Sequence, residues 1–271
     1  VAAGGFGGTA TGINGGAADG FANIDAVTGT LLGDTLTSNL IDGATTAPID
    51  GAFTLNASGS SFLASGTTLS FSSFETINGG AGIETFQVDS DFTADLTGGD
   101  GNDVVTLAAG VALTGSVDTG GDDDSLVLGN GASLSGPYSA GSGSDTLDLA
   151  AFTTARNVAL TARNTTDGGY DDTSSSLGFN FTSVNTLLGS GDTGADDTLG
   201  GVVQDAVWSI DSVGSDSTYR DAGSTQTLTF RGFEDLAGNT DSDEFGFVAG
   251  VTGSFVVTGG AGGQDVLTSV D

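Results

Sequence analysis

The chain has 271 residues, of which 48 are Gly and 2 are Pro, and it contains no Cys, Met or His. It has 35 acidic residues and only four basic ones, all Arg, which gives a formal net charge of −31. This charge disfavours nucleic acids and anionic membranes as partners, because no cationic patch can release their counterions. No run of 18 apolar residues is present, so no membrane span is expected, and a composition rich in Gly, Asp, Thr, Ser and Ala favours strands and turns over helices.

In chain order, the first recurring motif is Gly-Gly-x-Gly-x-Asp, followed by alternating apolar residues. Residues 79–84 carry it with Glu84 in place of Asp, and residues 98–103 carry it in full. Degraded copies lead to Asp124, Asp145 and Asp265. The motif therefore recurs about once every 21 residues, and a fixed period of this length is typical of repeat proteins in which each repeat packs only on its neighbours.

Five columns of residues keep their chemical character from one repeat to the next: Asp103–Asp124–Asp145, Val105–Leu126–Leu147, Leu107–Leu128–Leu149, Phe92–Leu113–Leu134 and Leu96–Val117–Tyr138. Apolar and polar residues also alternate within each repeat, which indicates strands. The sequence therefore predicts an all-β fold, namely a single elongated parallel β-solenoid (β-helix) of about 21 residues per turn over residues 1–271. The step from Glu84 to Asp103 is shorter than the step from Asp103 to Asp124, which predicts a tighter corner between Val88 and Phe92.

The sequence also contains a second, longer repeat in addition to the 21-residue period. Residues 71–77 match residues 230–236, Phe86 matches Phe245, and residues 53–56 resemble residues 208–211. The units are 1–159 and an incomplete 160–271 within one continuous domain. We expect the chain to be a segment of a longer array that continues at one or both ends, with further repeats of the same or a neighbouring chain as its head-to-tail partners.

The whole chain resembles the repeat regions of giant bacterial surface proteins of the filamentous-haemagglutinin-like type. The resemblance is carried by residues 208–210 (Trp-Ser-Ile), 228–230 (Leu-Thr-Phe) and 232–234 (Gly-Phe-Glu), together with the Gly/Asp segment at 98–107. It implies a secreted, adhesive or filament-forming β-solenoid outside the cell or on its surface.

The Gly/Asp turns also resemble the calcium-binding nonapeptides of RTX toxins and proteases, although here the motif occurs only once in each turn. Stacked carboxylates about 5 Å apart would repel by roughly 3 kcal/mol at an effective dielectric constant of about 20. Cations or hydrogen bonds from turn amides would relieve that repulsion, and calcium suits an all-oxygen corner. The predicted calcium ligands are Asp100, Asp103, Asp122, Asp124 and Asp145; the alternative is that these residues serve only as turn formers.

The absence of His, Cys and Lys removes most catalytic bases and nucleophiles, so we expect no enzyme activity. The function predicted is that of a structural or adhesive segment of an extracellular bacterial surface protein, stiffened by calcium. Host or neighbouring cell-surface polymers are its expected targets. A calcium-dependent module that binds carbohydrate or protein is the alternative, and a polysaccharide-degrading β-helix enzyme is a third, weaker one.

Overall fold

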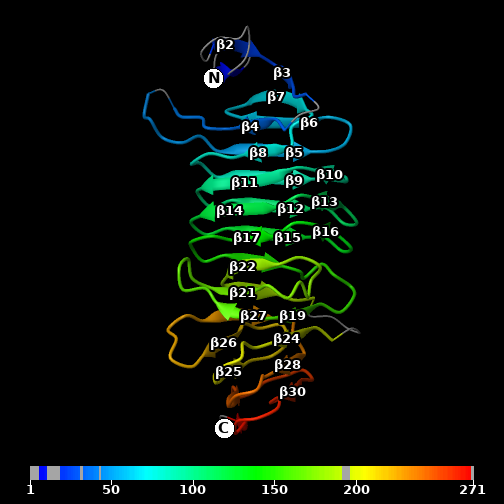
Figure 1. The fold of residues 1–271 in the computed structure, drawn as a ribbon, viewed down its shortest axis with the longest axis vertical. Helices are drawn as coiled ribbons and strands as arrows, with labels where there is room; N and C mark the ends of the chain where they lie inside the picture. The colour runs from blue at the N-terminus through cyan, green and yellow to red at the C-terminus, as the bar shows by residue number, and fades with distance from the viewer. Residues whose placement is uncertain (1–5, 11–18, 31–32, 43, 191–195, 270–271) are drawn as a thin grey trace.

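A computed structural model describes residues 6–10, 19–30, 33–42, 44–190 and 196–269. These residues form 31 β-strands and no helix, so the predicted all-β class is confirmed. The strands lie in successive layers along one long axis, with the two ends of the chain at opposite ends of that axis (Figure 1). No helix in the described part of the chain is long and apolar enough to cross a membrane.

The largest sheet has 14 strands and runs along most of the molecule. In spatial order it contains β3 (Ala26–Thr28), β7 (Thr67–Ser72), β6 (Ser60–Ala64), β5 (Gly51–Leu55), β9 (Glu84–Val88), β12 (Val104–Leu107), β15 (Ser125–Leu128), β18 (Thr146–Asp148), β23 (Thr186–Leu188), β27 (Leu228–Arg231), β26 (Ser217–Asp221), β25 (Ala206–Ile210), β29 (Asp243–Phe247) and β31 (Val266–Ser269).

Four smaller sheets complete the described structure. The eight-stranded sheet has the order β20 (Ala162–Arg163), β21 (Tyr170–Asp172), β22 (Phe181–Val184), β17 (Tyr138–Ser139), β14 (Val117–Gly121), β11 (Asp95–Asp100), β8 (Thr76–Asn78) and β4 (Thr35–Thr37). The others are β19 (Asn157–Ala159), β24 (Thr198–Gly200), β28 (Asp235–Ala237) and β30 (Val256–Thr258); β10 (Phe92–Thr93), β13 (Ala112–Thr114) and β16 (Ser133–Leu134); and β1 (Phe6–Ala10) with β2 (Asp19–Ile24).

The central layers repeat at a constant offset along the chain. β12, β15 and β18 are parallel neighbours, with Val105 opposite Leu126 and Leu126 opposite Leu147. β11, β14 and β17 pair at the same offset. The offset between β9 and β12 is shorter, because the chain takes fewer residues from Val88 to Phe92 than it takes over the equivalent stretch from Leu107 to Leu113.

Outside this region the predicted parallel arrangement is interrupted. Three antiparallel insertions enter the sheets: β5–β6–β7, β20–β21–β22 and β25–β26–β27. Their strands are joined by connections of two to eight residues, and the two-residue hairpin among them is one that only antiparallel strands can form. Ser65 and Gly66, with φ of 49° and 77°, form such a turn between β6 and β7. The insertions lengthen the offset between parallel neighbours, so that Thr146 pairs with Thr186 and Thr186 pairs with Thr229.

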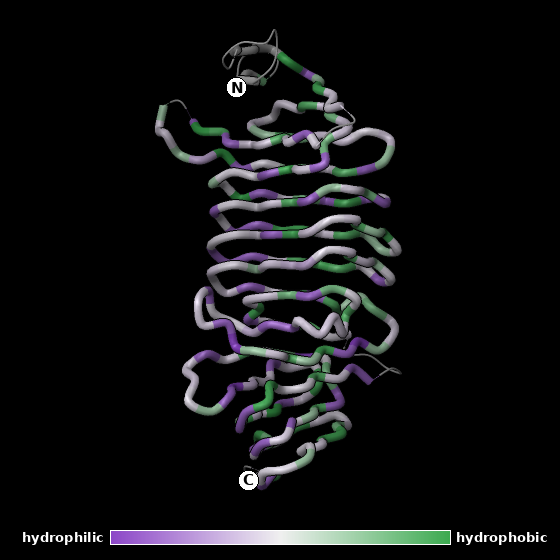
Figure 2. Tube along the Cα trace, in the orientation of Figure 1, coloured by the Kyte–Doolittle hydropathy of each residue, from purple (hydrophilic) through white to green (hydrophobic). Residues whose placement is uncertain are grey.

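The core consists of columns of like side chains inside the layers, and Figure 2 shows hydrophobic stretches recurring at matching places along the axis. The rings of Phe53 and Phe86 stack at 4.7 Å, and those of Trp208 and Phe245 stack at 5.3 Å; all four side chains are buried. Residues that match in the long repeat thus occupy equivalent places. The edge-on pair formed by Phe71 and Phe74 also has its counterpart in Phe230 and Phe233.

Candidate functional site

The structure brings together three of the five predicted calcium ligands in one buried column. Asp103, Asp124 and Asp145 each precede a strand of the 14-stranded sheet and are at most 1% exposed. Glu84, which holds the same position at the start of β9, is also 1% exposed and extends the column by one layer. We refer to Glu84, Asp103, Asp124 and Asp145 as the acidic ladder.

Hydrogen bonds connect the acidic ladder from layer to layer. The backbone N–H of Glu84 donates to Asp103 Oδ1 at 2.7 Å, that of Asp103 to Asp124 Oδ1 at 2.7 Å, and that of Asp124 to Asp145 Oδ1 at 2.9 Å. The last N–H, that of Asp145, donates to the amide oxygen of Asn185 at 3.1 Å. Each of these aspartates therefore satisfies a buried backbone donor at the corner between two sheets, which would otherwise be left unpaired.

The second carboxyl oxygen of each ladder residue is buried, and the Thr119 hydroxyl lies near enough to the Asp124 carboxyl group to lower its pKa. Asp103 Oδ2, Asp124 Oδ2, Asp145 Oδ2 and Glu84 Oε1 are buried and accept no hydrogen bond from the residues that the structure describes. An ionised carboxylate is disfavoured in such surroundings, so burial should raise the pKa of each group.

The pKa values follow this geometry. Burial raises the pKa of Asp103 to about 8, that of Asp124 to about 6 and that of Asp145 to about 7, against an ordinary value of 3.8. The backbone hydrogen bond to each group opposes the rise, and the neighbouring carboxyl groups add to it. Burial likewise raises the pKa of Glu84. The ladder is therefore a row of proton-binding groups inside the protein.

The carboxyl groups of the ladder also explain why the motif has a glycine at position 98. A Cβ atom at Gly98 would lie 2.1 Å from Asp103 Oδ2 and 2.5 Å from the carbonyl oxygen of Thr119. At Gly238 it would lie 2.1 Å from Asp243 Oδ2. The first glycine of the motif thus leaves room for the acidic side chain at its end, and this accounts for the spacing within the repeated motif.

The other two predicted ligands, Asp100 and Asp122, lie at the exposed corner of the same layers. Asp122 Oδ2 accepts a hydrogen bond from the backbone N–H of Gly101 at 3.1 Å, and the neighbouring Asp123 accepts one from Ser144 at 2.9 Å. Within the described residues, no group of three or more Asp, Glu, His or Cys is placed to hold a metal ion. Calcium binding at this corner stays a prediction, and Asp100 and Asp122 are its exposed acids.

The sequence-based prediction missed several equivalents of the ladder. Glu75 Oε2 accepts a hydrogen bond from Asp34 N–H, and Glu234 Oε2 accepts one from Asp197 N–H, both at 2.9 Å. Asp265, which the motif had already marked in the sequence, accepts in the same way through Oδ1 from Asp243 N–H at 3.1 Å. The long repeat contained this signal, because Glu75 and Glu234 hold the same position in the matching segments 71–77 and 230–236. Layer-to-layer acid–amide bonds are thus a general feature of the described structure.

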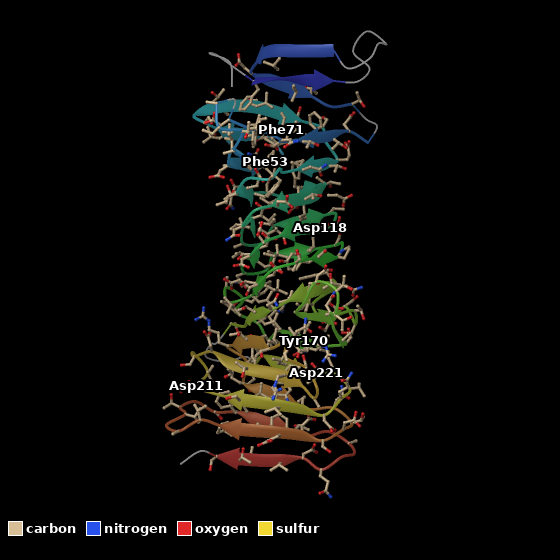
Figure 3. The ribbon with its side chains drawn as sticks, turned by 90° about the vertical axis from the view of Figure 1, so that its left-hand side faces the viewer. Phe53, Phe71, Asp118, Tyr170, Asp211 and Asp221 are labelled. Carbon is tan, nitrogen blue, oxygen red and sulfur yellow. The ribbon has the colours of Figure 1, made fainter. Side chains whose placement is uncertain are left out.

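A second buried polar network, also absent from the sequence-based predictions, joins an insertion to the large sheet. Arg163 Nη1 lies 2.6 Å from Asp221 Oδ2, and the Tyr170 hydroxyl donates to Asp221 Oδ1 at 2.7 Å. Figure 3 places Tyr170 and Asp221 close together in the lower part of the stack. Asp221 is fully buried, so the network fixes the β20–β21 hairpin against β26.

Comparison with known proteins gives no match to a protein-family model, a curated protein or a solved structure.

Proposed function

We propose that the chain is a structural, non-catalytic segment of an extracellular surface protein or filament, built as an elongated β-solenoid with about 21 residues per regular turn. The observation that carries this proposal is the column of buried side chains that continues through the 14-stranded sheet. Phe53, Phe86, Val105, Leu126 and Leu147 are opposite one another in five consecutive parallel strands. Such stacking produces length rather than a single central cleft, and length is what a stalk requires.

The net charge of the chain and the exposed edge of its largest sheet both support a structural role outside the cell. The formal charge of −31 keeps such a surface soluble and hydrated. At one edge of the 14-stranded sheet, β31 leaves Leu267 67% exposed and Val266 48% exposed. An apolar open edge favours pairing with another strand. The proposed partner is therefore a further layer of the same kind, in this or a neighbouring chain, and cell-surface polymers are the proposed targets of adhesion.

The test is localisation on cells that make the protein. Antibodies against the folded chain should label intact, unpermeabilised cells, and the label should extend away from the envelope in electron micrographs. Brief treatment of intact cells with protease should remove it, while an internal control protein survives. Label confined to the cell interior would overturn the proposal. Release of reducing sugar or unsaturated products from acidic polysaccharides would instead favour the β-helix enzyme.

Calcium is proposed to stiffen the exposed Gly/Asp corner, and binding there would also serve the alternative role of a calcium-dependent module that binds carbohydrate or protein. Millimolar calcium should raise the melting temperature by a few degrees, because a ligand that binds only the folded state stabilises it by mass action. Asp122→Asn should reduce the shift, whereas Asp118→Asn, an exposed acid on β14, should leave it unchanged. An unchanged melting temperature in calcium would leave turn formation as the role of these acids.

A further inference from the structure

One cavity lies beside the point where the regular layers end. It has a volume of about 190 Å³, and its walls include Leu128, Leu134, Leu149, Phe152 and Phe179. These five side chains are at most 5% exposed. For comparison, an apolar engineered cavity of about 150 Å³ stays dry and binds benzene. The space here is therefore large enough for one aromatic ring.

The cavity results from a missing strand. β10, β13 and β16 pair in the regular register, and the three-stranded sheet ends at β16. One repeat further along the chain, Thr154 and Ala155 occupy the equivalent positions and form no strand with β16. The next layer thus leaves a space beside Leu134 that Phe152 and Phe179 only partly fill. The layers of β10, β13 and β16 are closed at the equivalent place by a paired strand.

Arg156 gives this apolar recess a positive charge. Its guanidinium lies 4.5 Å from the centre of the Phe152 ring and lines the cavity. Nε donates to the carbonyl oxygens of Thr154 and Ala155, and Nη2 donates to Thr154 Oγ1, so the described residues leave three of the five guanidinium N–H donors unused. Among the described residues no carboxylate forms an ion pair with Arg156, in contrast to Arg163 and Arg231.

We propose that this cavity binds a small organic carboxylate, with an apolar body of about one aromatic ring among the leucines and its carboxylate on Arg156. The lining residues include no Asp or Glu that would repel such a ligand. Arginine is well suited to this role because its planar donors match the two oxygens of a carboxylate. The apolar walls supply affinity and the guanidinium supplies selectivity for the anion. This activity goes beyond the proposed structural role and does not depend on it.

The experiment is a titration of the whole 271-residue chain with benzoate, benzyl alcohol and benzylamine, followed by NMR of the leucine methyl groups. These probes share one ring and differ in charge. A salt concentration of about 0.15 M shortens the range of the general negative potential to about 8 Å. We expect saturable shifts at Leu134 and Leu149, with benzoate binding about tenfold more tightly than benzyl alcohol and benzylamine binding most weakly.

Two variants locate the interaction. Arg156→Gln should reduce benzoate affinity to that of benzyl alcohol, whereas the matched control Arg231→Gln, which changes a half-exposed arginine in β27, should leave it unchanged. Ala132→Leu, which adds volume at the cavity wall, should prevent binding of all three probes. If Ala132→Leu does not fold, the arginine pair decides the question. Absence of saturable shifts at concentrations on the order of 10 mM, or a benzoate preference that survives in Arg156→Gln, would overturn the proposal.

Discussion

Raising the pH from 5 to 9 should destabilise the folded chain, and the acidic ladder should be the main cause. The pKa values of Asp103, Asp124 and Asp145 rise from 3.8 in the unfolded chain to about 8, 6 and 7 in the folded one. Between pH 3.8 and about 8 the folded state therefore binds more protons than the unfolded state. The stabilisation from each group is complete below pH 3.8 and is lost as the pH rises through its folded-state pKa.

The expected size of this effect is large. A group that is protonated in the folded chain and ionised in the unfolded chain reduces the free energy of unfolding by about 1.4 kcal/mol per pH unit. Denaturant titrations at each pH, extrapolated to water, provide the measurement. Well above pH 8 the ladder contribution should level off, because all three groups are then ionised in both states.

A substitution separates the ladder from the general repulsion of a chain with a net charge of −31. Asp124→Asn keeps a side-chain oxygen for the N–H of Asp103 and removes the titrating group. It should reduce the slope up to about pH 6, where Asp124 contributes, leave the contributions of Asp103 and Asp145 at higher pH, and stabilise the protein at pH 8. Asp118→Asn, an exposed acid on β14 that is not among the charges shifting the pKa of these three aspartates, should leave the slope unchanged. Because salt screens exposed charges far more than buried ones, the slope should also persist in salt of about 0.5 M. A stability that increases from pH 5 to 9 would contradict the ladder as described.

The regular part of the fold could be predicted from the sequence because its period is constant. Stepping by one repeat placed Leu96 opposite Val117 and Val117 opposite Tyr138, and the strands pair in that register. Constant spacing works here because each layer repeats the local conformation of the last. The insertions do not follow the constant spacing. In residues 51–72 the alternation of polar and apolar residues indicates strands but does not indicate their direction. The antiparallel direction of β6 and β7 depends on the positive φ angles of Ser65 and Gly66. The 21-residue spacing of like residues does not reveal backbone angles.

The burial of the acids could have been read from the sequence but was not. In a strand, residues two apart share a face, so Asp103 belongs on the same side as Val105 and Leu107. Both of those residues are core residues, and Asp103 is as buried as they are. The prediction of metal ligands rested on the type of residue and its position in the turn. What it lacked was the partner of each carboxyl group, a backbone N–H one layer away, which becomes visible only when the layers are stacked.

Gly98→Ala should be among the most damaging single substitutions in the regular layers. The backbone of Gly98 has an ordinary φ, so the effect is one of contact: the new methyl group would lie 2.1 Å from Asp103 Oδ2 and 2.5 Å from the Thr119 carbonyl oxygen. The second of these is a backbone atom in the neighbouring layer and cannot turn aside. The layers must separate or the ladder must break, and we expect a loss of ~3 kcal/mol or more in the free energy of unfolding.

Gly214→Ala is the matched control, because a Cβ atom there meets nothing within 4 Å and its φ is also ordinary. It should change stability by less than about 0.5 kcal/mol. Hydrogen exchange should show where the damage from Gly98→Ala lies. In a stack whose layers contact only their neighbours, protection should fall in β9, β11, β12 and β14 and remain near normal in β25 and β29. Equal stability of the two alanine variants would mean that Asp103 does not occupy the space beside Gly98, and the acidic ladder would then need a different arrangement of its second oxygens.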